Sequence, residues 1–347
     1  MKLSIIDQSP VPAGATPADA LRNTIDLARL ADQLGYERYW IAEHHATPGL
    51  ASPAPEVLLA RVGIETTGIR IGSGGVLLPH YSPLKVAETF RVLHALYPGR
   101  IDLGIGRAPG SSPLEAYALR RDRYQRTLVD DFPEQLVEIL AFLRHAFAPD
   151  HPFRQIKVSP DMPGGPEVWL LGSSIWSATA AAQLGLPYAF AHFINPEPTR
   201  AAIEYYHSHV TAAGVSVPQT ILALGVICAD TEAEAQRLNA SVRLRRVIRE
   251  LGADPGPIPT PEEALARLGP GPDQGIPEEG EWPRYIVGAP EQVRAKLVRM
   301  AKELRVKELM VVTVVHDHEA RRRSHQLLAE IFGLAPRAQD RGRPRVC

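Results

Sequence analysis

Short apolar runs alternate with longer amphipathic segments along most of the chain. The runs are nearly continuous in apolar residues, as in parallel strands that are buried on both faces. Eight of them predict strands, at Leu3–Asp7, Arg38–Ala42, Ile69–Leu78, Ile101–Gly106, Val168–Gly172, Tyr188–Phe193, Thr220–Ala229 and Glu308–Val315.

The segments between these runs predict helices, because their apolar residues recur at helical spacing. Four of the expected helices begin with a proline in the first turn, at Thr16-Pro17, Ser82-Pro83, Phe132-Pro133 and Ala289-Pro290. Proline is well tolerated there, since that position has no intrahelical hydrogen bond to lose. Strands that alternate with helices predict an α/β fold of the (β/α)₈ barrel type. The competing topology, a doubly wound open sheet, lacks the expected G-x-G-x-x-G after the first strand.

One stretch interrupts this regular pattern. Residues 250–285 are rich in proline and glycine and form an insertion before the eighth predicted strand. Such a long connection is either a lid or substrate loop, or a flexible insertion without a particular role. We expect a single barrel domain over residues 1–334, followed by a disordered Arg- and Pro-rich tail over residues 335–347.

Composition narrows the class of partner. The 347 residues include 38 basic and 39 acidic side chains, for a formal net charge of -1. This balance provides no long-range attraction to nucleic acid or to an anionic membrane, so we expect a small-molecule ligand. With two cysteines, no apolar run of about 20 residues and no signal peptide, the sequence predicts a cytoplasmic protein without disulfides.

The ends of the predicted strands carry the candidate chemistry, because barrel enzymes place their active sites there. The second strand ends in Glu43-His44-His45, which is compatible with a metal ligand, a catalytic base or a polar strand end. Adjacent strand residues point to opposite faces, so His44 and His45 are poorly placed to bind one ion. A metal held by His44, His192 and His316 has no local motif behind it, and we predict no metal site.

A second group of residues favours an anion site. Residues 172–182, GSSIWSATAAA, place Ser173, Ser174 and Ser177 at the start of an expected helix, where free N–H groups attract phosphate. The alternative is that one serine merely caps the helix. Arg107 ends the fourth strand and either binds phosphate or forms a surface ion pair. Glycines flank Ser73 inside the third strand, which indicates a bulge or the close approach of a flat ligand.

Four blocks in order carry a family resemblance: YERYWIAEHHATPGLASPAPEVLLA, IRIGSGGVLLPHYSPLKVAETFRVLHALYPGRIDLGIGRAPGS, WLLGSSIWSATAAAQLGLPYAFAHF and YIVGAPEQVRAKL. With them the chain resembles the bacterial luciferase-like flavin monooxygenases. The resemblance implies a barrel that binds FMN, reduced by a separate reductase, and uses O₂ to oxidise a small organic substrate. It also implies a homodimer.

The resemblance assigns roles to individual residues. It implies that His44 is the acid/base group, and that a non-prolyl cis peptide joins Ser73 and Gly74 beneath the flavin. The implied phosphate contacts are Arg107, Gly172, Ser173, Ser174 and Ser177. Gly106 replaces the reactive cysteine of luciferase proper, which weakens any claim of light emission. A second phosphate-binding arginine of the family has no obvious counterpart, and Arg120, Arg121 and Arg123 are the candidates.

Two other functions stay open on this barrel. One is an F420-dependent dehydrogenase, which transfers hydride and ignores O₂. The other is a flavin-binding protein without catalysis.

Overall fold

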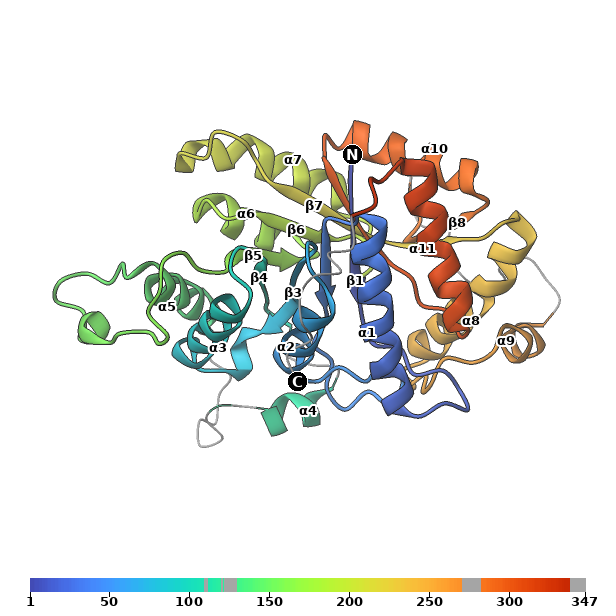
Figure 1. The fold of residues 1–347 in the computed structure, drawn as a ribbon, viewed down its shortest axis with the longest axis horizontal. Helices are drawn as coiled ribbons and strands as arrows, with labels where there is room; N and C mark the ends of the chain where they lie inside the picture. The colour runs from blue at the N-terminus through green and yellow to red at the C-terminus, as the bar shows by residue number, and fades with distance from the viewer. Residues whose placement is uncertain (109–111, 120, 122–129, 270–281, 338–347) are drawn as a thin grey trace.

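The computed structural model describes residues 1–108, 112–119, 121, 130–269 and 282–337 (Figure 1). The strands of this part are β1 Lys2–Asp7, β2 Arg38–Ile41, β3 Arg70–Leu77, β4 Ile101–Gly106, β5 Glu167–Gly172, β6 Tyr188–Ala191, β7 Thr220–Cys228, β8 Tyr285–Gly288 and β9 Glu308–Val312. Its α-helices are α1 Pro17–Leu34, α2 Pro55–Glu65, α3 Pro83–Leu96, α4 Pro113–Leu119, α5 Phe132–Arg144, α6 Ile175–Gln183, α7 Thr199–His209, α8 Glu232–Glu250, α9 Pro261–Leu268, α10 Pro290–Glu303 and α11 His318–Phe332. Short 3₁₀ turns lie at Leu78–His80, Pro152–Gln155 and Val210–Ala213.

The strands form a closed parallel barrel. β1 to β6 pair in sequence, β6 pairs with β7, and β9 lies between β7 and β1. Helices surround the strands on the outside (Figure 1). The predicted (β/α)₈ barrel is confirmed, and its eight strands, β1 to β7 and β9, all match predicted apolar runs.

The helix starts also follow the sequence signals. α1, α3 and α10 begin at the expected prolines, and α5 begins one residue earlier, at Phe132. Thr16 caps α1 with a reciprocal capping box to Asp19. Asp131, which precedes α5, makes no such cap and instead pairs with Arg121.

The predicted insertion needs correction, because part of it is regular structure. α9 has its own capping box at Thr260, and β8 extends the sheet beside β7. Phe193 after β6 donates to the carbonyl of Ala223, and Gly225 donates to that of Arg284. Alternate residues of a strand form hydrogen bonds on the same side, so β8 pairs with β7 on the side where β6 pairs, beyond the point at which β6 ends. Tyr285–Gly288 was missed because four residues are too few to show a strand period.

The predicted disordered tail falls mostly on residues 338–347, which lie outside the described residues and leave that expectation untested. Before them, the amide of Arg337 donates to the carbonyl of Gln33, so the chain follows the end of α1. No helix in the described part of the chain combines the length and apolar character needed to span a membrane.

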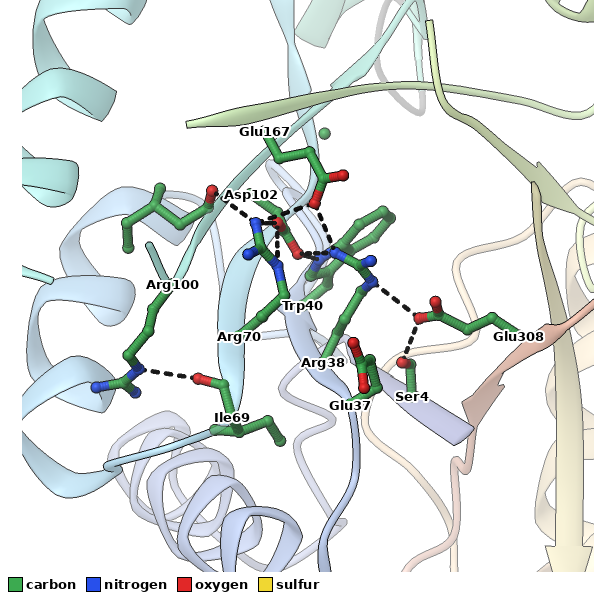
Figure 2. A network of polar contacts seen from close by, with 12 residues as sticks. Ser4, Glu37, Arg38, Trp40, Ile69, Arg70, Arg100, Asp102, Glu167 and Glu308 are labelled. Carbon is green, nitrogen blue, oxygen red and sulfur yellow. Dashed lines mark hydrogen bonds and ion pairs between the residues drawn. The ribbon is translucent and has the colours of Figure 1, made fainter. Parts of the chain in front are cut away.

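A layer of charged side chains closes the N-terminal end of the barrel (Figure 2). Arg38, at the start of β2, forms ion pairs with Asp102 at 2.9 Å, Glu308 at 2.9 Å and Glu167 at 3.1 Å. Arg70 pairs with the same Asp102 and Glu167. These groups come from β2, β3, β4, β5 and β9, so the network joins strands that are far apart in the sequence across one side of the barrel.

Apolar side chains fill the barrel above this layer. Trp40 and Trp169 lie edge to face at 5.7 Å, and the indole N–H of Trp40 donates to Asp102. A buried inner cluster continues upward through residues such as Ala42 and Val312. Along β2 and the residue after it, therefore, Arg38, Trp40 and Ala42 point inward, and the same two-residue period leads to His44 at the opposite, C-terminal mouth.

Candidate active site

His44 lies at the C-terminal mouth of the barrel and faces a large cavity. The cavity has a volume of about 1540 Å³ and is lined by residues that follow several strands, including Gln8, Phe193 and Val314, and by α8. This is larger than most ligand pockets of single-domain enzymes. The cavity therefore has room for both a flat cofactor and an organic substrate.

Burial sets the protonation of His44. It lowers the pKa of the imidazole to about 4, and the nearby charge of Arg249 adds to the effect. The ring is therefore neutral at pH 7 and able to accept a proton. Its Nδ1 is buried without a hydrogen-bond partner in the structure. This nitrogen is therefore open to a hydrogen bond with a bound molecule.

Glu43 and His45 point away from the cavity and bond to each other. Glu43 is 5% exposed and accepts three hydrogen bonds, from His45 at 2.7 Å, from the Tyr81 hydroxyl at 2.7 Å and from the Leu77 amide at 3.0 Å. The carboxylate thus ties the end of β2 to the end of β3. The geometry agrees with the expectation that the side chains of the two histidines point to opposite faces.

The other two strand-end histidines have structural partners. His192 lies 2.7 Å from the Thr199 hydroxyl and 3.1 Å from the Pro283 carbonyl, and His316 lies 3.1 Å from the carbonyl of Ala13. Within the described ranges, no three His, Cys, Asp or Glu side chains are grouped closely enough to hold a metal ion.

The predicted anion-binding residues gather at the neighbouring part of the mouth. The Arg107 guanidinium stacks 4.5 Å above the ring of Trp176, in the first turn of α6, and it also pairs with Asp130. The structure thus brings together the arginine after β4 and the helix start after β5. Because Asp130 already neutralises Arg107, a phosphate at this position has to displace or share that carboxylate.

The serines of the α6 start fall into two groups. Ser174 is exposed at the N-cap position, and its side chain makes no capping hydrogen bond. The first N–H groups of α6 therefore lack a side-chain cap. Ser177 is buried instead; its hydroxyl donates to the Ser174 carbonyl at 2.7 Å and lies 3.0 Å from the Tyr188 hydroxyl. The backbone carbonyl of Ser173 accepts a hydrogen bond from the side-chain amide of Asn195 at 3.3 Å.

The third strand differs from the expectation in two respects. The non-prolyl cis peptide joins Gly74 and Gly75, so its prediction at Ser73–Gly74 is wrong by one residue. Ser73 is fully buried; its hydroxyl donates to the Gly104 carbonyl at 2.9 Å and accepts from the Gly104 amide at 3.1 Å. The side chain of Ser73 therefore stabilises the pairing of β3 with β4. A ligand would contact Ser73 through its backbone and not through its hydroxyl.

The seven predicted cofactor residues do not line the large cavity themselves. The two regions meet through the loop after β6, where Ile194 lines the cavity and the next residue, Asn195, contacts Ser173. Of the candidates for a second phosphate-binding arginine, Arg121 donates to the Pro79 carbonyl and pairs with Asp131. Arg120 and Arg123 lie outside the described residues.

Comparison with protein families shows to which family this barrel belongs. The family model for luciferase-like monooxygenases matches residues 1–308. The chain belongs to the luciferase-like monooxygenase family. Relatives within it agree: the chain is 38% identical to a luciferase-like monooxygenase of Escherichia coli (strain K12), covering 94% of this chain and 96% of that protein. It is 36% identical to N-acetyl-S-alkylcysteine monooxygenase of Bacillus subtilis (strain 168), covering 97% and 100%.

Solved structures support the same assignment. The crystal structure of apo-MsnO8 is similar with a TM-score of 0.88 and 51% identity, covering 97% of this chain and 99% of that one. Two more distant chains share the fold: the oxygenating constituent of 3,6-diketocamphane monooxygenase with FMN (TM-score 0.68, 20% identity) and an F420-dependent secondary alcohol dehydrogenase (0.66, 15%). This luciferase-like protein is therefore an oxidoreductase of the monooxygenase type, on a fold that carries flavin-type cofactors in its structural neighbours.

Two features of this luciferase-like site were not predicted from the sequence. One is the wall that α8 contributes to the cavity, with four arginines between positions 243 and 249. The other is Tyr285, which lines the cavity from β8. The dense run RLRRVIR was the available signal for the first, whereas the second depended on a strand too short to recognise.

Gly172, at the end of β5, is required by the packing of α6. A Cβ at this position would overlap the Cβ and Oγ of Ser177. We expect Gly172→Ala to lower the free energy of unfolding by about 1–3 kcal/mol, because the start of α6 has to move away. We also expect weaker FMN binding, measured by quenching of flavin fluorescence.

Gly106→Ala is the matched control for stability, since a Cβ there meets no atom closer than 3.7 Å. Urea unfolding of both variants checks the expectation. Equal midpoints for the two variants would show that the α6 start accommodates the methyl group.

Proposed function

We propose that this protein uses reduced FMN and O₂ to oxidise a small organic substrate. The observation that carries the proposal is the position of His44, neutral and without a partner for its buried Nδ1, on a 1540 Å³ cavity at the barrel mouth. The neighbouring rim supplies Arg107 and the uncapped start of α6, which suit a phosphate group. Arg107 and the start of α6 suit the phosphate end of FMN, and His44 suits the flavin ring at the other end.

The protein contributes positioning, proton transfer and protection from water. Arg107 and the first turn of α6 hold the phosphate end, and when bound, reduced FMN supplies the two electrons that activate O₂. His44 accepts a proton from the reacting group and returns it, which its low pKa permits at neutral pH. Phe193, Val242 and Val314 provide apolar lining that disfavours water in the cavity.

A separate reductase and a homodimer belong to the same proposal. The barrel uses nearly all of the described chain, and the sequence has no nicotinamide fingerprint, which supports a separate reductase as the source of reduced flavin. α2 exposes Val57 and Ile64, each 65% exposed, and α3 exposes Leu96. Apolar side chains on adjacent outer helices support a contact between two copies.

The name of one relative suggests a first substrate. N-acetyl-S-alkylcysteines contain a thioether sulfur that accepts an oxygen atom, together with an apolar alkyl group. We propose compounds of this kind, such as N-acetyl-S-benzylcysteine, for the first activity screen.

Rapid mixing tests the proposed cofactor and oxidant. Protein with anaerobically reduced FMN is mixed with oxygenated buffer, and the flavin absorbance is followed. We expect a spectrum that differs from both reduced and oxidised FMN and that persists longer than the reoxidation of free FMN. Reoxidation with the kinetics of free flavin would contradict the proposal, and F420 binding followed by hydride transfer would then be tested as the alternative function.

A further inference from the structure

The cavity that contains His44 is lined by more positive than negative side chains. Among the described residues, two acidic side chains line it, Glu115 and Asp254. The basic ones are Arg243, Arg245, Arg246, Arg249, Arg284 and Lys296. Four of these six are on α8, so one wall of the cavity carries most of the positive charge.

Several of these cations have partners within the protein. Arg245 donates to the carbonyl of Gly256, Arg246 forms an ion pair with Glu250 at 2.9 Å, and Arg284 donates to the carbonyl of Ile194. Arg249 differs, because its guanidinium has no hydrogen bond or ion pair with any residue that the structure describes.

The charge of Arg249 also acts on the reacting part of the site. Its charge lowers the pKa of His44 after the larger effect of burial, and it likewise lowers the pKa of Arg245. An arginine in the last turn of a helix is often explained by the helix dipole. Arg249 is itself exposed, so its guanidinium is open to a ligand, and it lines the same cavity as His44 and the buried Arg245. An anion bound there would reduce the repulsion between the two guanidinium groups.

The other residues that line the cavity indicate the chemical character of the rest of the ligand. Val242, Val287 and Val314 lie around the same cavity as Arg249, which gives it an apolar part and a cationic part. A planar guanidinium binds a carboxylate with two parallel hydrogen bonds.

We propose that the substrate is a small organic anion, whose carboxylate binds Arg249 while its apolar, oxidisable part faces His44. This inference rests on the proposed function and specifies the substrate class of the same site.

Binding of matched acids and amides tests the inference. The probes are N-acetyl-S-benzylcysteine, 4-phenylbutanoic acid and dodecanoic acid, each compared with its primary amide by isothermal titration, with and without oxidised FMN. For the wild-type protein we expect at least one acid to bind about tenfold or more tightly than its amide. In Arg249→Gln that preference should disappear, while FMN affinity stays unchanged.

Arg237→Gln is the matched control. It removes the same charge from the same helix, but Arg237 pairs with Glu234 and Glu262 and does not line the cavity. We expect this variant to keep the preference for acids. In ¹³C-histidine NMR spectra, the bound acid should shift the signal that is lost in His44→Gln, which places the ligand beside His44.

Three results would overturn the inference. They are equal affinity for acids and amides, no binding of any acid, or a loss of FMN affinity in Arg249→Gln that matches the loss for the acid. The last result would identify the cofactor phosphate as the anion. Since the titration needs neither reduced flavin nor O₂, its outcome is separate from that of the rapid-mixing experiment.

Discussion

His44→Gln is expected to retain FMN but to lose about 10²- to 10⁴-fold in the rate of substrate oxidation, the usual contribution of a positioned acid/base group. Glutamine preserves much of the volume and polarity of the side chain, so the cavity keeps its shape. It cannot exchange a proton with the reacting group. Oxygen should then be consumed without product and appear as hydrogen peroxide, and the ratio of product to peroxide measures this directly.

The control is His45→Gln, the neighbouring histidine whose side chain bonds Glu43 outside the cavity. This variant should stay within about threefold of the wild type, since glutamine can still donate to the carboxylate. Full coupling in His44→Gln would remove His44 from the mechanism.

The pH profile provides an independent check on His44. Its pKa is lowered to about 4, so the neutral, proton-accepting form persists well below the usual imidazole range. The acid limb of kcat/KM should therefore lie near pH 4, and it should be absent in His44→Gln. An acid limb near 6.5 would mean that the imidazole is solvated during turnover.

Arg38→Met is expected to destabilise the fold by about 3–5 kcal/mol, the usual effect of removing one partner from a buried ion pair. Methionine fills much of the space of the arginine, so lost packing is a small part of this value. The large effect arises because Asp102 is fully buried and Glu308 is 6% exposed, and both lose their main cation. Equilibrium urea unfolding at pH 7 measures it.

The same variant should have an unusual dependence on pH. Burial already raises the pKa values of Asp102 and Glu308, and loss of Arg38 raises them further. Above about pH 4, the ordinary range of these carboxyls, the folded state then binds more protons than the unfolded state, so stability rises as the pH falls toward that range. Arg22→Met, which removes an exposed ion pair with Asp19, should change stability by less than about 1 kcal/mol. Identical stabilities for the two variants would contradict a structural role for the network.

The main outline of the fold was accessible from the sequence because it depends on local patterns. Apolar runs marked the strands of the barrel, and prolines marked the helix starts, since both signals act within a few residues. The divergence of His44 and His45 followed from the same kind of rule, the alternation of side chains along a strand, whereas the choice of His44 for the active site came from the family resemblance.

Features that depend on distant parts of the chain were not accessible. Nothing near Arg38 indicates that a charged residue at the start of a strand is buried, because its partners are Asp102, Glu167 and Glu308. Similarly, the serine side chains predicted to contact phosphate gave no sign that Ser177 bonds inward to Tyr188. The pairing of residues that are far apart decides both cases.

The position of β9 has a consequence for how the protein is made. β9 pairs with one edge of β1, the first strand to be synthesised, and with one edge of β7. Until residue 312 has left the ribosome, both strands present an unpaired edge, and Arg38 lacks Glu308. Such edges are sites of wrong pairing with other chains. We therefore expect the nascent protein to depend on chaperones over most of its synthesis, and a truncation before β9 to aggregate although it contains every other strand of the barrel.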